Sequence, residues 1–212
     1  VEARVPGDGY LALQDAGSLP DLTVGTNVWG ALKLEQLEWR YLRSFDAPAL
    51  KPGEKAELVF VGVDTRATYT LNCKVIGKSA NMFVPQRFDV TDMLKPSGNK
   101  IEVLIASPLG RGLLNVLGRS RVGGTDVEGI RKAQHSFGWD IMPRVVCGGI
   151  WRSVRVEILP PERFGDVFWI VERVDAKKKT ADVRVQCQVL APRKRLHASM
   201  LKVSLALNGK VV

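Results

Sequence analysis

The chain has 212 residues, enough for one full domain and part of a second. Hydrophobic residues make up 45% and charged residues 25% of the sequence, proportions typical of a folded globular protein and not of a disordered or collagenous chain. The net charge of +9 would suit a polyanion, but no helix-turn-helix, zinc-finger or RNA-binding aromatic pattern accompanies it, so we expect no nucleic-acid partner. No apolar run reaches the roughly 18–20 residues of a membrane-spanning helix, so we expect no membrane partner either.

Short apolar runs of alternating polarity, separated by Gly, Pro, Asn and Asp clusters, predict an all-β sandwich or barrel. Residues 28–38 show the best helical period, and it predicts at most a short amphipathic turn or two. Because β-branched and aromatic residues suit a pleated, half-buried surface, strands are expected in the first part of the chain at 58–63, 68–73, 100–106 and 153–159.

Pro160-Pro161 closes the fourth strand, since proline cannot donate to a strand ladder, and we place a domain boundary there. Beyond it, strands are expected at 167–171 and 181–189, joined by a solvated lysine-rich turn. A further strand at 201–207 meets Asn208-Gly209, a strong hairpin signal. The sequence therefore predicts domains 1–160 and 161–212, the second with about three strands and incomplete, as in a fragment of a longer protein.

The three cysteines lack the spacing of a zinc or redox site, and their odd number is unlike a disulfide framework, so buried free thiols are expected. No cluster of residues indicates a cofactor or a metal ion. The loop from Ser136 to Asp140 is the most distinctive feature, because Phe137, Trp139 and Asp140 crowd beside Gly138. An apolar ring beside a carboxylate is the composition of a sugar subsite, since the ring packs on C–H faces and the carboxylate accepts hydroxyl hydrogen bonds.

The segments Phe137 to Arg144 and Gly148 to Val154 resemble the end of the N-terminal sugar-binding domain of glycoside hydrolase family 2, most closely its β-mannosidase branch. The resemblance covers roughly residues 1–160 and depends on an ordered series of motifs. The other matching pieces are Val5-Pro6-Gly7, Trp39-Arg40-Tyr41, Phe60 to Thr65, Leu71-Asn72, Asn81-Met82-Phe83, Phe88 to Thr91 and Leu94 to Asn99.

The resemblance implies a galactose-binding-like jelly roll followed by the first strands of an immunoglobulin-like sandwich. It also implies a (β/α)8 barrel that carries the two catalytic glutamates, and such a barrel takes roughly 250 residues, more than the whole chain has. This chain is therefore expected to hold no catalytic residue. Its expected partners are a β-linked glycoside and the barrel of the parent enzyme.

By the same resemblance, Asp140 would accept hydroxyl hydrogen bonds, Trp139 would wall the pocket, and Asn27 would lie in a loop that faces the barrel. Asp64 would cap a turn between strands. Ile141-Met142-Pro143 stands where the family has Trp-Gly-Pro, so a β-galactoside or β-glucuronide stays open beside a β-mannoside. A free-standing carbohydrate-binding module is the alternative function. The habit of related enzymes suggests a periplasmic or extracellular location.

Overall fold

The computed structural model describes residues 1–109, 130–138, 140, 142–192, 200, 202–204, 206–207 and 210–211. The chain divides into two compact units, which are described separately below. Unit 1 comprises Val1–Leu50 and Ala56–Ile158, and unit 2 comprises Lys51–Lys55 and Leu159–Val212. The division into domains 1–160 and 161–212, and the immunoglobulin-like assignment of the second, stay predictions.

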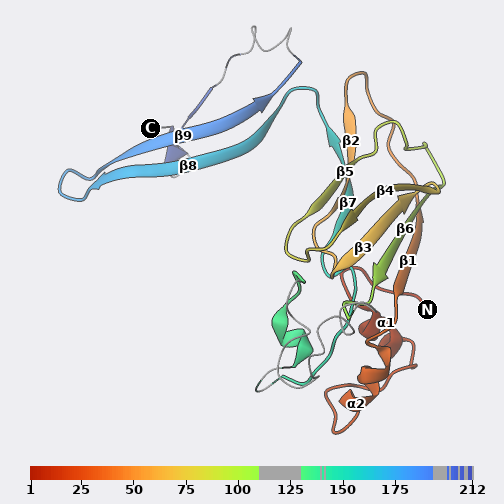
Figure 1. Cartoon of the computed structure of the whole chain (residues 1–212). Coiled ribbons are helices and arrows are strands. Elements are labelled where there is room, and N and C mark those ends of the chain that lie inside the picture. The colour runs from red at the N-terminus through yellow and green to blue at the C-terminus, as the bar shows by residue number, and fades with distance from the viewer. Residues whose placement is uncertain are drawn as a thin grey trace. The chain divides into compact units, whose positions relative to one another are not determined.

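Unit 1 is built mainly from strands, with short helices at one end (Figure 1). One sheet has the order β1-β6-β3-β4 with antiparallel neighbours, and the other has the order β5-β2-β7. The elements are α1 (Gly9–Asp15), α2 (Val28–Ala31), the 3-10 helix η1 (Leu32–Leu34), β1 (Trp39–Phe45), β2 (Lys55–Phe60), β3 (Arg66–Leu71), β4 (Lys74–Ser79), β5 (Gln86–Asp89), β6 (Asn99–Ala106), the 3-10 helix η3 (Gln134–Phe137) and β7 (Val154–Leu159).

The core of unit 1 lies between these two sheets. Alternate residues of β3 and β6 are buried, as expected for strands with one face on a core. Phe60, Tyr69 and Phe88 join the sheets through ring contacts, with centroids 4.7 Å apart for Phe60 and Tyr69 and 4.8 Å apart for Tyr69 and Phe88. Tilted aromatic pairs at this separation are favourable beyond the area that they bury. The two sheets therefore form a sandwich, and the predicted all-β fold is confirmed.

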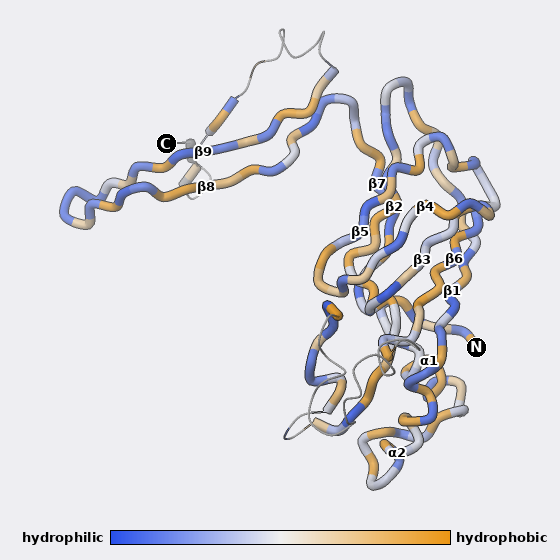
Figure 2. The backbone as a smooth tube through the Cα atoms, viewed as in Figure 1, coloured by the Kyte–Doolittle hydropathy of each residue, from blue (hydrophilic) through white to orange (hydrophobic). Residues whose placement is uncertain are grey.

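Unit 2 is dominated by one long antiparallel hairpin of β8 (Arg163–Asp175) and β9 (Thr180–Leu190). Both strands contain the runs predicted at 167–171 and 181–189. The predicted turn follows β8, where the Asp175 carboxylate accepts hydrogen bonds from the amides of Lys177 and Lys178, each 3.0 Å long. Figure 2 shows this turn as a hydrophilic end of the hairpin.

Two short strands complete the description of unit 2. β10 (Ala206–Leu207) pairs antiparallel with β11 (Lys210–Val211) on either side of Asn208 and Gly209, which lie outside the described residues. The strand predicted over 201–207 is shorter in the structure, because residues 202–204 form no regular element.

Two predicted strand ends in unit 1 are wrong. β3 ends at Leu71 and not at residue 73, because Asn72 and Cys73 have positive φ values of 50° and 68° and form the turn into β4. Asn tolerates this left-handed conformation, which a continuing strand does not allow. β2 ends at Phe60, three residues before the predicted end. Cys73 is also exposed, contrary to the expectation of a buried thiol, although all three cysteines are free.

Candidate functional site

The loop that carries Asp140 begins at η3, at the end of unit 1 where α1 and α2 also lie (Figure 1). Gly138 ends η3 with a φ of 97°, a conformation that favours glycine, and its amide donates to the carbonyl of His135 over 3.0 Å. The amide of Val145 donates to the carbonyl of Ser136, also over 3.0 Å, and so joins the two ends of the loop. The Asp140 side chain is exposed. Trp139 lies outside the described residues.

Arg144 anchors the C-terminal end of this loop. Its guanidinium donates to both carboxylate oxygens of Glu35, over 2.8 Å from Nε and 3.0 Å from the second nitrogen. The same group donates to the carbonyl of Phe137 over 3.3 Å and lies 5.7 Å from the centre of the Phe137 ring. Glu35 is only 7% exposed. A planar, bidentate contact of this kind fixes the orientation of the guanidinium relative to the carboxylate as well as the distance between them.

Lys132 anchors the N-terminal end of the loop through a second ion pair. Its ammonium contacts the carboxylate of Asp64 and donates to the carbonyl of Cys147 over 2.7 Å. Lys132 is 3% and Asp64 is 7% exposed, so both charges are buried. The prediction that Asp64 caps a turn is therefore corrected: its side chain pairs with a cation 68 residues away and accepts from the Thr65 hydroxyl.

Tyr10 of α1 connects the helical segments to the irregular segment that follows the loop. Its hydroxyl lies 3.1 Å from the carbonyl of Ala31 and 3.0 Å from that of Val146, so it is shared between two acceptors. Its ring meets Trp39 edge-on, with centroids 5.7 Å apart. Burial, followed by the nearby Glu35 carboxylate, raises the pKa of Tyr10 above its usual value, so the hydroxyl stays a donor.

Asn27 is half-buried at the start of α2, and its amide serves a local turn. The side-chain nitrogen donates to the carbonyl of Asp21 over 2.9 Å. The Asp21 carboxylate accepts from the amide and the hydroxyl of Thr23, and these bonds lower its pKa. Among the described residues, Asn27 and Asp140 share no hydrogen bond or ion pair. The segments that carry them are instead connected through Tyr10 and the Glu35–Arg144 pair.

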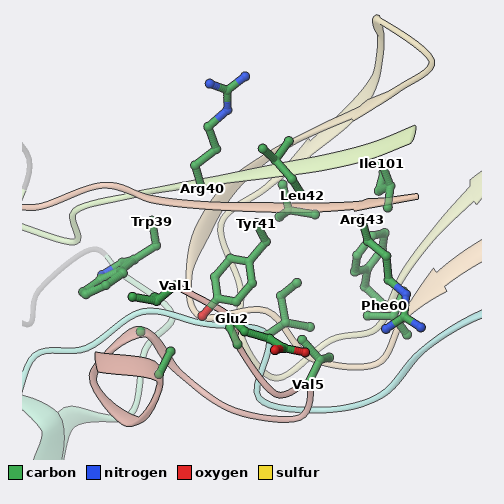
Figure 3. Close-up of a pocket in the computed structure, with 16 residues that line it drawn as sticks. Val1, Glu2, Val5, Trp39, Arg40, Tyr41, Leu42, Arg43, Phe60 and Ile101 are labelled. Atoms are coloured by element: carbon green, nitrogen blue, oxygen red, sulfur yellow. The ribbon is translucent and has the colours of Figure 1, made fainter. Parts of the chain in front are cut away.

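Unit 1 also contains a cavity of about 400 Å³ between its N-terminal segment and β1 (Figure 3). Neither Asn27 nor Asp140 lines it. Glu2 is the only carboxylate in the lining, whereas glycoside hydrolysis needs a pair of them. The Tyr41 side chain extends from β1 toward Glu2, and its hydroxyl has no hydrogen-bond partner among the described residues. The lining is mostly apolar, with Val1, Val5, Ala12, Trp39, Leu42, Phe60, Ile101, Val103, Ile150 and Val154 among its residues.

Neither a metal centre nor a membrane span is indicated by the part of the chain that the structure describes. No group of three or more His, Cys, Asp or Glu side chains is placed to hold a metal ion there. In the same residues, no helix is long and apolar enough to cross a membrane.

Unit 1 is thus a sandwich of two sheets, with the exposed carboxylate of Asp140 on the loop that follows η3. The chain belongs to the glycosyl hydrolase 2 galactose-binding domain-like family, whose family model matches residues 1–152. The resemblance found in the sequence motifs is therefore confirmed.

Among curated proteins, the chain is similar to β-mannosidase B of Thermothelomyces thermophilus, with 34% identity over 216 residues, 99% of this chain and 24% of that protein. Among solved structures, it is similar to a β-D-mannosidase from Dictyoglomus thermophilum, with a TM-score of 0.77 and 32% identity over 88% of this chain and 23% of that one. An Amycolatopsis orientalis exo-chitosanase shares the fold at 16% identity and a TM-score of 0.62, over 88% of this chain and 20% of that one. The chain spans about a quarter of the length of these curated relatives.

The anchoring residues were not predicted as functional residues. Arg144 lies in the recognised motif, but Glu35 is 109 residues away, and neither residue type nor local spacing connects them. Lys132 likewise reads as a surface cation in sequence, and only the fold buries it beside Asp64. Ion pairs between residues so far apart leave no local pattern in the sequence, and both pairs become evident only in the folded chain.

Proposed function

We propose that this chain forms the sugar-binding domain of a β-mannosidase of glycoside hydrolase family 2. The observation that carries the proposal is similarity to a β-mannosidase along 99% of the chain, at 34% identity. The match of the family model to residues 1–152 supports the domain assignment. Because the chain spans about a quarter of its relatives' length, the hydrolytic glutamates are proposed to lie on a catalytic barrel outside it.

Asp140 is the residue proposed to bind the sugar in this domain. Its carboxylate is exposed, and the segments before and after it are held by ion pairs at Lys132 and Arg144, so it is free to accept hydroxyl hydrogen bonds. Trp139 is proposed to wall the same subsite, and Asn27 to approach it from α2. The subsite would be completed by the barrel, which makes the barrel the second proposed partner.

Kinetics on the full-length polypeptide that carries this chain test the proposal. Its kcat/KM would be measured with p-nitrophenyl β-D-mannopyranoside, galactopyranoside and glucuronide. We expect the mannoside to be preferred and Asp140→Ala to lower kcat/KM for it about tenfold or more, because a bond to a sugar hydroxyl is lost. Asp92→Ala, which removes another exposed carboxylate of unit 1, is the matched control and should leave kcat/KM unchanged.

Two results would contradict parts of this proposal. Preference for the galactoside or the glucuronide would overturn the substrate assignment. Calorimetric binding of mannose to the 212-residue chain alone, abolished by Asp140→Ala, would favour a free-standing carbohydrate-binding module over a subsite shared with a barrel. A periplasmic or extracellular location stays a prediction, which cell fractionation tests.

A further inference from the structure

The loop that carries Asp140 is held at both ends by ion pairs, in which Lys132, Asp64 and Glu35 are buried and the Arg144 side chain is 28% exposed. At one end the Lys132 ammonium contacts the Asp64 carboxylate, and at the other the Arg144 guanidinium forms a bidentate ion pair with the Glu35 carboxylate. Both carboxylates come from distant parts of the chain, 68 and 109 residues away from their cations. The two ends of the loop are thus attached to the rest of unit 1 by side chains that are distant in sequence.

We propose that Arg144 is a positioning residue, which fixes the position of Asp140 through its ion pair with Glu35. This inference rests on the proposed function of Asp140. Arg144 contacts both the start of the loop and the distant Glu35, since it donates to the Phe137 carbonyl and to both Glu35 carboxylate oxygens. Val145, the next residue, closes the loop through its bond to Ser136. Arg144 and Val145 are therefore bonded to residues that precede Asp140 by three and four positions, which joins the chain before Asp140 to the chain after it.

The energetics of an ion pair that is largely out of water favour a positioning role for Arg144 over a stabilising one. An ion pair taken out of water loses about as much by desolvation as it gains by attraction, so an apolar pair of similar size often stabilises a fold equally well. What the apolar pair cannot reproduce is direction, because a guanidinium–carboxylate fork has a fixed plane and two parallel bonds. The Glu35–Arg144 pair is thus better suited to fixing a geometry than to holding unit 1 together.

Hydrogen exchange of the 212-residue chain tests the inference without any sugar. The key variant, Glu35→Leu with Arg144→Met, removes both charges and leaves no unpaired one. We expect the Val145 amide to exchange about tenfold faster or more, while amides of β3 and β6 keep their protection. The melting temperature should stay within about 3 °C of the wild type. Arg144→Lys keeps the charge without the fork and should give a smaller rise in the Val145 exchange rate.

Arg87→Met is the matched control, because it breaks exposed ion pairs with Glu57 and Glu157 in the same unit. It should leave the exchange of Val145 unchanged. Unchanged exchange of Val145 in the apolar pair, or faster exchange throughout unit 1, would overturn the inference. If the apolar pair does not fold, Glu35→Gln replaces it: this variant keeps the shape of the side chain but removes one of the two acceptors of Arg144, and it should also make the Val145 amide exchange faster while β3 and β6 keep their protection.

Kinetics of the full-length protein then connect loop position to activity. We expect the apolar pair to lower kcat/KM for the mannoside, Arg144→Lys to recover part of it, and the apolar pair added to Asp140→Ala to lower it no further. If Asp140→Ala lowers kcat/KM but the apolar pair does not, the positioning role alone is overturned. If Asp140→Ala itself has no effect, the proposed function is overturned together with it.

Discussion

Tyr10 and Tyr41 both lie inside unit 1, but their hydroxyls differ in what they contact. The Tyr10 hydroxyl reaches two backbone carbonyls, of Ala31 and Val146. The Tyr41 hydroxyl is buried beside the cavity without a hydrogen-bond partner among the described residues. A buried hydroxyl stabilises a fold only where it is hydrogen-bonded. Its removal then leaves the buried acceptor without a donor, which costs stability. The two phenols therefore offer a direct comparison at the level of one oxygen atom.

Replacing each tyrosine by phenylalanine should give opposite results. We expect Tyr10→Phe to lower the free energy of unfolding by about 1–3 kcal/mol, because two buried carbonyls lose their donor. Tyr41→Phe should leave it within about 0.5 kcal/mol or raise it, because no bond is lost. Urea unfolding followed by circular dichroism measures both. Equal losses in the two variants would show that the Tyr41 hydroxyl is paired in solution.

The cysteines should differ in reactivity. Cys73 is exposed in the turn between β3 and β4, whereas burial raises the pKa of the Cys147 thiol to about 11. Only the thiolate reacts with alkylating agents. At pH 8 we expect iodoacetamide to modify Cys73 well before Cys147, as read by mass spectrometry of peptides. Faster labelling of Cys147 would contradict this order.

At the scale of elements, the N-terminal segment is attached to the irregular segment before β7 by close backbone contact. The amide of Gly7 donates to the carbonyl of Ile150 over 2.9 Å, and the amide of Gly9 donates to that of Gly148 over 3.0 Å. A Cβ on Gly149 would stand 2.4 Å from the Asp8 Cα and 2.5 Å from the Gly7 carbonyl oxygen. Glycine at this position is what allows the two segments to approach, and Asp8 in turn caps α1.

Gly149→Ala should therefore separate these segments. We expect it to lower the free energy of unfolding by roughly 1–3 kcal/mol, because backbone atoms and not a flexible side chain must move. Gly30→Ala in α2 is the matched control: nothing lies within 4 Å of its added Cβ, and alanine favours helix, so stability should stay the same or rise. Similar losses in both variants would contradict the contact at Gly149.

Elements with a strong local pattern could be predicted from sequence, and those set by tertiary contacts could not. The alternation of Ile101, Val103 and Ile105 predicted β6 nearly to its ends, because one face of that strand is buried. β5 has four residues and β4 has no clear alternation, and neither was predicted from its local pattern. The candidate site followed the same rule: residues of the Asp140 loop were recognised from a motif, whereas Glu35 joins the site only through the fold.

At the scale of the whole molecule, burial raises the pKa values of several tyrosine and cysteine side chains of unit 1. Burial raises the pKa of Tyr41 to about 12 and that of Tyr69 to about 12, and the pKa of Tyr10 is raised as well. Burial raises that of Cys147 to about 11. In the unfolded chain a Cys thiol ionises near pH 8.5 and a Tyr phenol near pH 10, about as in model peptides. The folded state therefore holds protons that the unfolded state releases.

Unit 1 should lose stability as the solution becomes alkaline. The protonated groups contribute fully below the pKa values of the unfolded chain, and their contribution falls as pH rises from about 8.5 toward the folded values. We expect the melting temperature to drop steadily between about pH 8.5 and pH 11, as followed by circular dichroism. Tyr41→Phe removes one of these groups, so its melting temperature should drop less over the same range than that of the wild type. Equal drops would mean that Tyr41 ionises alike in the folded and unfolded states, and that burial beside the cavity does not hold its proton.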